Sequence, residues 1–197
     1  MHAEEVYARS NPSGPLRQCE IISNIRQIIP TPGASWSGEV PRIEIIKHPF
    51  AVILSQDCDL TQDFDARSAE TPDPNLMLSS VLLCEAALAS DYRQRPKMGN
   101  IWKQLRQNDL VRYHYLCKIM PAQDAAGIGI DSLVLDFKRH FTLTTADVYE
   151  QVKLGAQRRS LMQCHYLEHL NTRFFYFQSR IAIPQPHLAR EESSPAE

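Results

Sequence analysis

The sequence has few glycines, no close cysteine pair and no long apolar run, and each absence excludes a class of protein. Seven glycines stand against thirteen prolines, so we expect stiff connections and few left-handed turns. Five widely spread cysteines without a C-x-x-C pair exclude a zinc ribbon or a disulfide framework, and favour reduced thiols in a cytosol. No apolar run approaches the roughly 18 residues that a membrane helix needs.

Neither sign of charge is in excess, because the net charge of the 197 residues is −2. This excludes a globally basic nucleic-acid binder but leaves room for local basic patches. The N-terminus has acids where a signal peptide needs bases, and no apolar segment follows it, so a cytoplasmic location is predicted. Phosphate-loop, dinucleotide, esterase and zinc-protease motifs are all absent, and we predict no cofactor.

The order of patterns predicts a single α+β domain, with strands first and helices last. Its key feature is the apolar run at residues 50–54, which is typical of an interior strand covered on both faces. The acidic, proline-containing stretch at 57–75 is interpreted as a loop. The predicted parts are a flexible arm (1–15), a β-rich core (16–143), a helical layer (144–183) and a disordered tail (184–197).

The C-terminal third changes to helical spacing. Thr144 or Thr145 is a suitable cap for a first helix that stops at Gly155. Ser160 begins an S-x-x-Q capping box for a second helix, along which apolar residues recur every three or four positions as far as Ile181. We expect both helices to pack on the core. The phenylalanine-rich helix is also the candidate face for a homodimer.

A thiol lies between two carboxylates directly after the predicted interior strand, at Asp57-Cys58-Asp59. In one interpretation Cys58 is a nucleophile or a metal ligand and the two acids shape its site, although negative charge nearby disfavours a thiolate. In the other, both acids accept main-chain hydrogen bonds in a turn while Cys58 packs inward as a small apolar side chain. The sequence leaves both open.

Two metal sites were considered, and no metal is predicted. The acids of 57–65 suit a hard cation, but the spacing and turn glycine of an EF-hand are missing and a solvated loop has the same composition. His165 and His169 share one helix face and are the pair that suits zinc, whereas Cys164 lies on the apolar stripe and is assigned to the core.

The stretch 92–108 is basic, contains no acid and has two large aromatic residues, Tyr92 and Trp102. A short helix is predicted within it, with Asn100 as its cap and with Ile101, Trp102 and Leu105 facing inward. Cations interleaved with aromatics are typical of surfaces that bind single-stranded nucleic acid, although a solvated helix face with a buried tryptophan has the same pattern. Lys138-Arg139-His140 and Arg158-Arg159 are candidates to extend such a patch. The predicted nucleic-acid-binding residues are Arg93, Arg95, Lys97, Trp102, Lys103 and Arg106.

The order "EIISNI", loop, "HPFAVILS" resembles the opening of the PemK/MazF-type toxins, over roughly residues 18–56. The resemblance implies a small, partly open SH3-like β-barrel and metal-independent RNA cleavage. Lys47 and His48 stand where the family has an arginine before proline, and Glu20 stands where it has an aspartate. The candidate catalytic residues are Lys47, His48, Asp57, Cys58 and Asp59.

"SQDCDL", with "YHYL", "LVLDF" and "LNTRFFYF" later in the chain, also resembles a group of uncharacterised bacterial proteins that carry an S-Q-x-C-D motif. This resemblance implies a bacterial accessory or defence setting. The leading hypothesis is a non-catalytic binding or adaptor module that contacts RNA, single-stranded DNA or a protein partner, and no membrane, through 92–108. The alternative is a PemK/MazF-like endoribonuclease, and a thiol-dependent enzyme ranks third.

Overall fold

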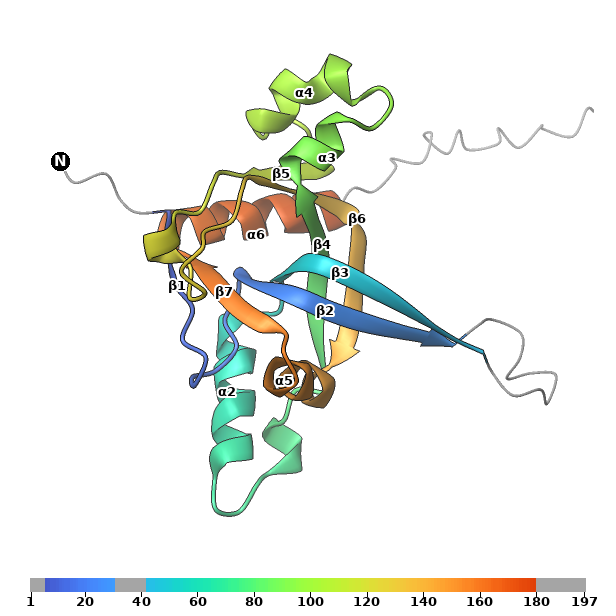
Figure 1. The fold of residues 1–197 in the computed structure, drawn as a ribbon. Coiled ribbons are helices and arrows are strands. Elements are labelled where there is room, and N and C mark those ends of the chain that lie inside the picture. The colour runs from blue at the N-terminus through green and yellow to red at the C-terminus, as the bar shows by residue number, and fades with distance from the viewer. Residues whose placement is uncertain (1–5, 31–41, 180–197) are drawn as a thin grey trace, which may run out of the picture.

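A single antiparallel sheet organises the computed structural model, which describes residues 6–30 and 42–179 (Figure 1). Its strand order is β1-β7-β2-β3-β4-β6-β5. The strands are β1 (Tyr7–Arg9), β2 (Glu20–Pro30), β3 (Ile43–Ile53), β4 (Ser80–Leu88), β5 (Tyr113–Leu116), β6 (Leu133–Thr144) and β7 (Gln157–Met162). The helices are α2 (Asp57–Ser68), α3 (Ala89–Arg93), α4 (Met98–Arg106), α5 (Thr145–Lys153) and α6 (Cys164–Gln178), with single 3-10 turns at Pro74–Leu76 and Pro121–Gln123.

The predicted α+β class is confirmed, whereas the sheet is open, with β1 and β5 as its edges, and does not close into a barrel. In the part of the chain that the structure describes, no helix is long and apolar enough to span a membrane. The predicted disordered tail (184–197) lies outside the described residues, as do the first five residues of the N-terminal segment 1–15 that was predicted to be flexible.

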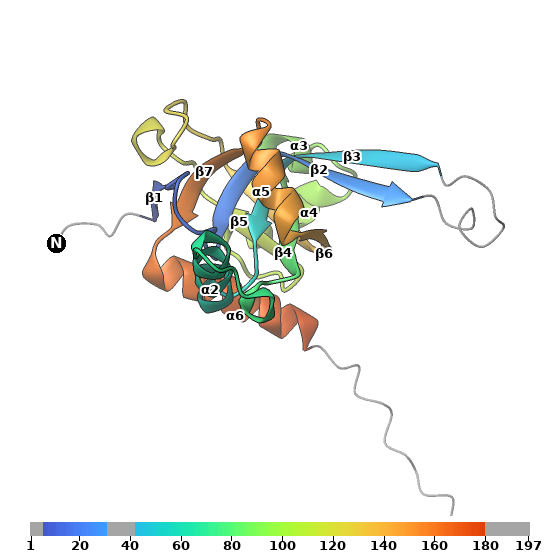
Figure 2. The same ribbon diagram turned by 90° about the horizontal axis from the view of Figure 1, so that it is seen from below.

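The interior strand predicted at residues 50–54 is confirmed. The end of β3 lies between β2 and β4, with Ala51, Val52 and Ile53 fully buried. Val52 packs in the cluster that contains Leu170 and Phe174 of α6, while Ala51 and Ile53 pack in the cluster that contains Leu60 of α2 and Val148 of α5. Figure 2 shows these three helices from below. Alternate side chains thus enter different cores, which explains why the apolar run has no polar position.

Two predictions about local structure are wrong. Residues 57–68 form α2 rather than a loop, because Asp57 and Asp59 occupy the first helical turn, where the helix dipole favours acids. The buried side chains of α2 follow at positions three apart, Leu60, Asp63 and Ala66.

Ser160 does not cap a helix either, because it pairs with Ile21 inside β7. A strand therefore separates the two C-terminal helices, and α6 begins only at Cys164. The cap predicted at Thr144 is confirmed, since its hydroxyl accepts a hydrogen bond from the Asp147 main-chain N–H. The phenylalanines of α6 divide between the core (Phe174 and Phe177) and the surface, where Phe175 is exposed.

Strands β2 and β3 continue beyond the rest of the sheet as a two-stranded ribbon, which we call the arm (residues 25–30 and 43–48; Figure 1). The pairing of β2 with β3 is irregular at Pro49, at the base of the arm. There, Asn24 adopts a positive φ of 62° within the partner strand, and Asn24 and Pro49 are missing from an otherwise regular pairing. Ile28, Ile43 and Ile45 are exposed on the arm.

Two adjacent arginines of β7 hold the distant parts of the chain together. Arg158 pairs with Glu20 and donates to main-chain carbonyls of residues 12–15. Arg159 donates hydrogen bonds to the Ser23 hydroxyl and, through two of its nitrogens, to the Asp124 carboxylate. The same carboxylate accepts hydrogen bonds from three main-chain N–H groups of the loop 126–129. Both arginines and both acids are buried. The proposal that Arg158 and Arg159 extend a surface patch is therefore wrong.

A buried histidine lies between β5 and α6. His114 is 2% exposed, contacts the rings of Phe137 and His169, and its Nδ1 has no partner among the described residues. Burial, followed by the nearby charges of Arg173 and His169, lowers the pKa of His114 to about 3. The ring is therefore neutral in the folded protein at neutral pH.

Replacing Arg159 with methionine should destabilise the fold by about 3–5 kcal/mol, because Asp124 would remain charged and buried without its cation. Lys118→Met is the matched control. Its pair with Asp131 is exposed on both sides, at 61% and 75%, so the cost should stay below about 1 kcal/mol. Urea unfolding followed by circular dichroism measures both. Equal losses in the two variants would contradict the structural role of the buried pair.

His114 should make the fold less stable in mild acid. The pKa of His114 is lower in the folded protein than in the unfolded chain, so its contribution to the free energy of unfolding is complete above the ordinary histidine pKa of 6.5. This contribution is lost as the pH falls from 6.5 toward about 3, because the unfolded chain then binds a proton that the folded protein does not. Between pH 7 and pH 5 the wild-type protein should lose about 2 kcal/mol more unfolding free energy than His114→Phe. Urea titrations at both pH values test this. His165→Phe, at an exposed position, should keep the wild-type dependence.

Candidate functional site

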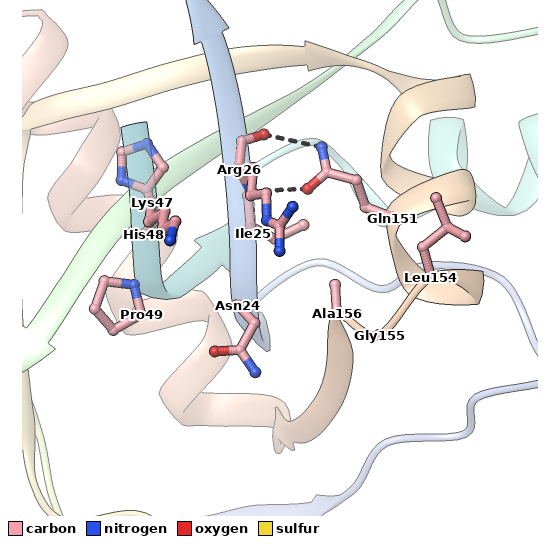
Figure 3. A pocket seen from close by; sticks show the side chains of 10 residues that line it. All are labelled: Asn24, Ile25, Arg26, Lys47, His48, Pro49, Gln151, Leu154, Gly155 and Ala156. Carbon is pink, nitrogen blue, oxygen red and sulfur yellow. Dashed lines mark hydrogen bonds between the residues drawn. The ribbon is translucent and has the colours of Figure 1, made fainter. Parts of the chain in front are cut away.

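A pocket of about 510 Å³ lies at the base of the arm, between β2, β3 and the end of α5 (Figure 3). The sequence candidates Lys47 and His48 line it together with Arg26, which the sequence analysis did not single out. The remaining lining residues are Asn24, Ile25, Pro49, Gln151, Leu154, Gly155 and Ala156. The pocket thus collects two exposed cations and an imidazole, a set of groups that favours an anion.

His48 is only 4% exposed and both of its ring nitrogens are engaged. Its Nδ1 lies 3.2 Å from Glu85 Oε2, its Nε2 lies 3.3 Å from Gln27 Oε1, and its ring stacks on Phe141 at 4.1 Å. The hydrogen bond with His48 lowers the pKa of Glu85, and Arg139 and Arg95 lower it further. The arrangement keeps His48 in place, and leaves no ring nitrogen for a substrate.

The edge of β2 in this pocket is completed by a side chain. Strand β7 pairs with β2 only as far as Ser23, so the main chain of Arg26 has no strand on that side. The Gln151 amide takes that place, because its Oε1 accepts from Arg26 N at 2.7 Å and its Nε2 donates to Arg26 O at 2.9 Å (Figure 3). Helix α5 thereby fixes the base of the arm.

The candidates Asp57, Cys58 and Asp59 lie elsewhere, in the first turn of α2. Asp57 forms a two-fold ion pair with Arg17, at 2.6 and 2.7 Å, and accepts the Gln18 N–H. Burial raises the pKa of Asp57, but the Arg17 and Gln18 hydrogen bonds outweigh it and the pKa is lowered. Asp57 and Cys58 line a separate, acidic pocket. The structure therefore does not join them to Lys47 and His48.

The Cys58 thiol is exposed, so the inward-packed turn proposed as an alternative is wrong. Its sulfur lies 3.5 Å from Asp59 Oδ1 and 3.7 Å from Gln56 Oε1, both of them acceptors. No cation lies among these contacts, and the two flanking carboxylates disfavour a thiolate even though Cys58 lies in the first turn of a helix. Asp63, included in the possible cation site, is fully buried and bound by Arg67 and the Leu78 N–H.

The predicted basic stretch forms two short helices, α3 and α4, that extend beyond the β5–β6 end of the sheet (Figure 1). The predicted inward position of Leu105 is confirmed, while Ile101 and Trp102 are only partly buried. Helix α4 begins at Met98, so the cap predicted at Asn100 is wrong. Within the described residues, none of the five cations of this stretch has a carboxylate within ion-pair distance. Five arginines elsewhere do, namely Arg17, Arg67, Arg112, Arg158 and Arg159. The five cations of the stretch are Arg93, Arg95, Lys97, Lys103 and Arg106.

Four arginines in this region lie over aromatic rings. The guanidinium carbon of Arg93 lies 5.9 Å from the centre of the Trp102 ring, and that of Arg95 lies 3.8 Å from the centre of the Tyr92 ring. The guanidinium carbon of Arg106 lies 5.9 Å from the centre of the Tyr115 ring, and that of Arg112 lies 4.9 Å from the centre of the Tyr113 ring. Contacts within about 6 Å are favourable cation–π interactions. We call this region the arginine–aromatic surface: Tyr92, Arg93, Arg95, Lys97, Trp102, Lys103, Arg106, Arg112, Tyr113 and Tyr115.

The aromatic partners from β5 were missed, because Tyr113 and Tyr115 lie beyond the basic stretch and approach it only when β5 pairs with β6. The candidate extension Lys138-Arg139-His140 is exposed on β6. Arg139 pairs with Glu85 at 3.2 Å, and Glu85 also experiences the charges of Arg95 and His48. Glu85 thus lies between the arginine–aromatic surface and the wall of the pocket.

Comparison of the chain with protein-family models, with curated proteins and with solved structures gave no match.

Replacing Gln151 with alanine should loosen the base of the arm without unfolding the protein, because it removes two hydrogen bonds from the edge of β2. At about 1 kcal/mol for one net hydrogen bond, amide exchange at Arg26 should accelerate about fivefold. Hydrogen exchange resolved by NMR measures it. Lys153→Ala, on the same helix but with an exposed partner, is the control and should leave Arg26 unchanged.

Proposed function

We propose that this protein is a nucleic-acid-binding module that contacts single-stranded RNA or DNA through its arginine–aromatic surface. The observation that carries the proposal is the contrast in charge pairing. Arg17, Arg67, Arg112, Arg158 and Arg159 each bind a carboxylate, whereas the five cations of residues 93–106 bind none among the described residues. Unpaired cations gathered on two short helices favour a polyanion as their partner.

The aromatic rings explain why a single strand suits this surface better than a duplex. Trp102, Tyr113 and Tyr115 are partly buried, so each ring holds an arginine in place. Arg95, at 3.8 Å from the Tyr92 ring, is close enough to stack on it. A guanidinium stacked on a ring keeps its outer face and its N–H groups available to an unpaired base or a phosphate. Such stacking needs splayed bases, which single strands provide.

A ribonuclease of the PemK/MazF type has less support. Its candidate Lys47 lines a pocket with Arg26, but His48 is buried with both ring nitrogens occupied, and the candidates Asp57 and Cys58 line another pocket. A protein partner remains the other proposal for the same surface. A homodimer, a cytosolic location and a bacterial accessory or defence role accompany the proposal as predictions from the sequence.

Reversing two of the unpaired cations should weaken binding to a labelled oligouridine of about 20 nucleotides. We expect Arg93→Glu/Lys103→Glu to lower the affinity at least about tenfold, and to reduce the slope of log affinity against log salt by about 1.4. Fluorescence anisotropy at several salt concentrations measures both quantities. Lys118→Glu/Lys153→Glu makes the same change in net charge on other exposed lysines, and should bind as the wild type does.

Equal losses in the two double variants would mean that only net charge matters, and would remove the assignment of a surface. Wild-type protein that binds neither RNA nor DNA would overturn the proposal itself. Cleavage of the RNA that is lost in Lys47→Ala, with binding retained, would instead establish the ribonuclease.

A further inference from the structure

We propose that Cys164, His165 and Glu168, at the start of α6, bind a zinc ion. The thiol sulfur, an imidazole nitrogen and a carboxylate oxygen of these residues all lie within 4.8 Å of one another. A cysteine, a histidine and an acid are the ligand types that zinc takes in proteins, and three of them leave a fourth position for water. The site lies outside both pockets and outside the arginine–aromatic surface.

The spacing of the donor atoms is close to that of a coordinated metal. Zinc binds sulfur at about 2.3 Å and nitrogen or oxygen at about 2.0–2.1 Å, so the donors of a tetrahedral site lie about 3.3–3.6 Å apart. Cys164 Sγ lies 3.6 Å from Glu168 Oε1, and His165 Nδ1 lies 3.9 Å from Glu168 Oε2.

The backbone that carries these residues is held from two directions. The Gln163 N–H donates to the Val6 carbonyl and the Leu167 N–H donates to the Gln163 carbonyl, which ties the first turn of α6 to the start of β1. Leu170 and Phe174 then anchor the next turns in the core. Metal sites need ligands on rigid elements, because each ligand that must be ordered on binding lowers the affinity.

The charge balance is also favourable. A thiolate and a carboxylate neutralise the two charges of zinc, and the positive end of the α6 dipole stabilises both anions at this position. His169, which the sequence suggested as the zinc partner of His165, is not a member of this group of donors, and its ring lies 5.4 Å from the His114 ring. Cys164, which the sequence analysis assigned to the core, is instead exposed.

Cobalt(II) and zinc(II) titrations of the reduced full-length protein test the proposal. We expect one cobalt per chain, with the ultraviolet charge-transfer band of a thiolate ligand and the intense visible bands of a tetrahedral site. Zinc should displace the cobalt, and competition with a chromophoric chelator should give its affinity. Cys164→Ser should abolish the charge-transfer band, and Glu168→Gln should weaken zinc binding about tenfold or more.

Two control variants separate this site from incidental metal binding. Cys58→Ser removes another exposed thiol and His169→Gln removes the neighbouring histidine, and both should bind zinc as the wild type does. Far-ultraviolet circular dichroism checks that each variant is folded. The absence of saturable one-to-one binding, loss of the cobalt band in Cys58→Ser, or full zinc affinity in Glu168→Gln would each overturn the proposal.

Discussion

Adjacent arginines on β7 point to opposite faces of the sheet, and each neutralises an acid that is completely excluded from water. Arg158 connects β7 to Glu20 at the start of β2, and also holds the main chain of residues 12–15. Arg159 connects β7 to Asp124 and, through it, to the loop that precedes β6. Removing either cation would leave a buried charge without compensation, so the position of β7 is tightly determined.

Once β7 is placed, the positions of the functional candidates follow. Because β7 begins only at Gln157, opposite Ser23, the outer edge of β2 beyond Ser23 has no strand beside it, and Gln151 of α5 supplies the missing hydrogen bonds. The pocket around Lys47 lies at that junction. On the other side of the sheet, the main chain continues from Met162 into α6, which presents Cys164, His165 and Glu168 at its exposed start.

Charge pairing separates the arginines that serve the fold from those left for a partner. The core arginines and Arg17 of the surface are matched by acids from distant parts of the chain, with sequence separations of up to 138 residues. Arg93, Arg95 and Arg106, on and between α3 and α4, lie over aromatic rings instead. An aromatic ring orients an arginine without neutralising its charge, so the positive potential of this region remains available.

Sequence reasoning succeeded where the signal is local. The strand at 50–54, the cap at Thr144 and the inward side of Leu105 depend on short-range spacing, and all three are confirmed. It failed at Asp57 and Ser160. Acids of a first helical turn resemble a polar loop, and a serine three residues before a glutamine occurs equally well in a strand. Both errors were decided by contacts with distant residues, Arg17 for Asp57 and Ile21 for Ser160.

The amino-acid sequence alone determined the α+β class, the interior strand and the basic, aromatic-rich character of residues 92–108, because period, composition and capping act over a few neighbouring residues. Only the tertiary structure decided which charges are paired. Arg158 and Arg159 look like a surface patch in the sequence and are buried, and Cys164 looks like core and is exposed. Pairing and burial depend on residues that are far apart in the chain, and therefore follow from strand order and packing.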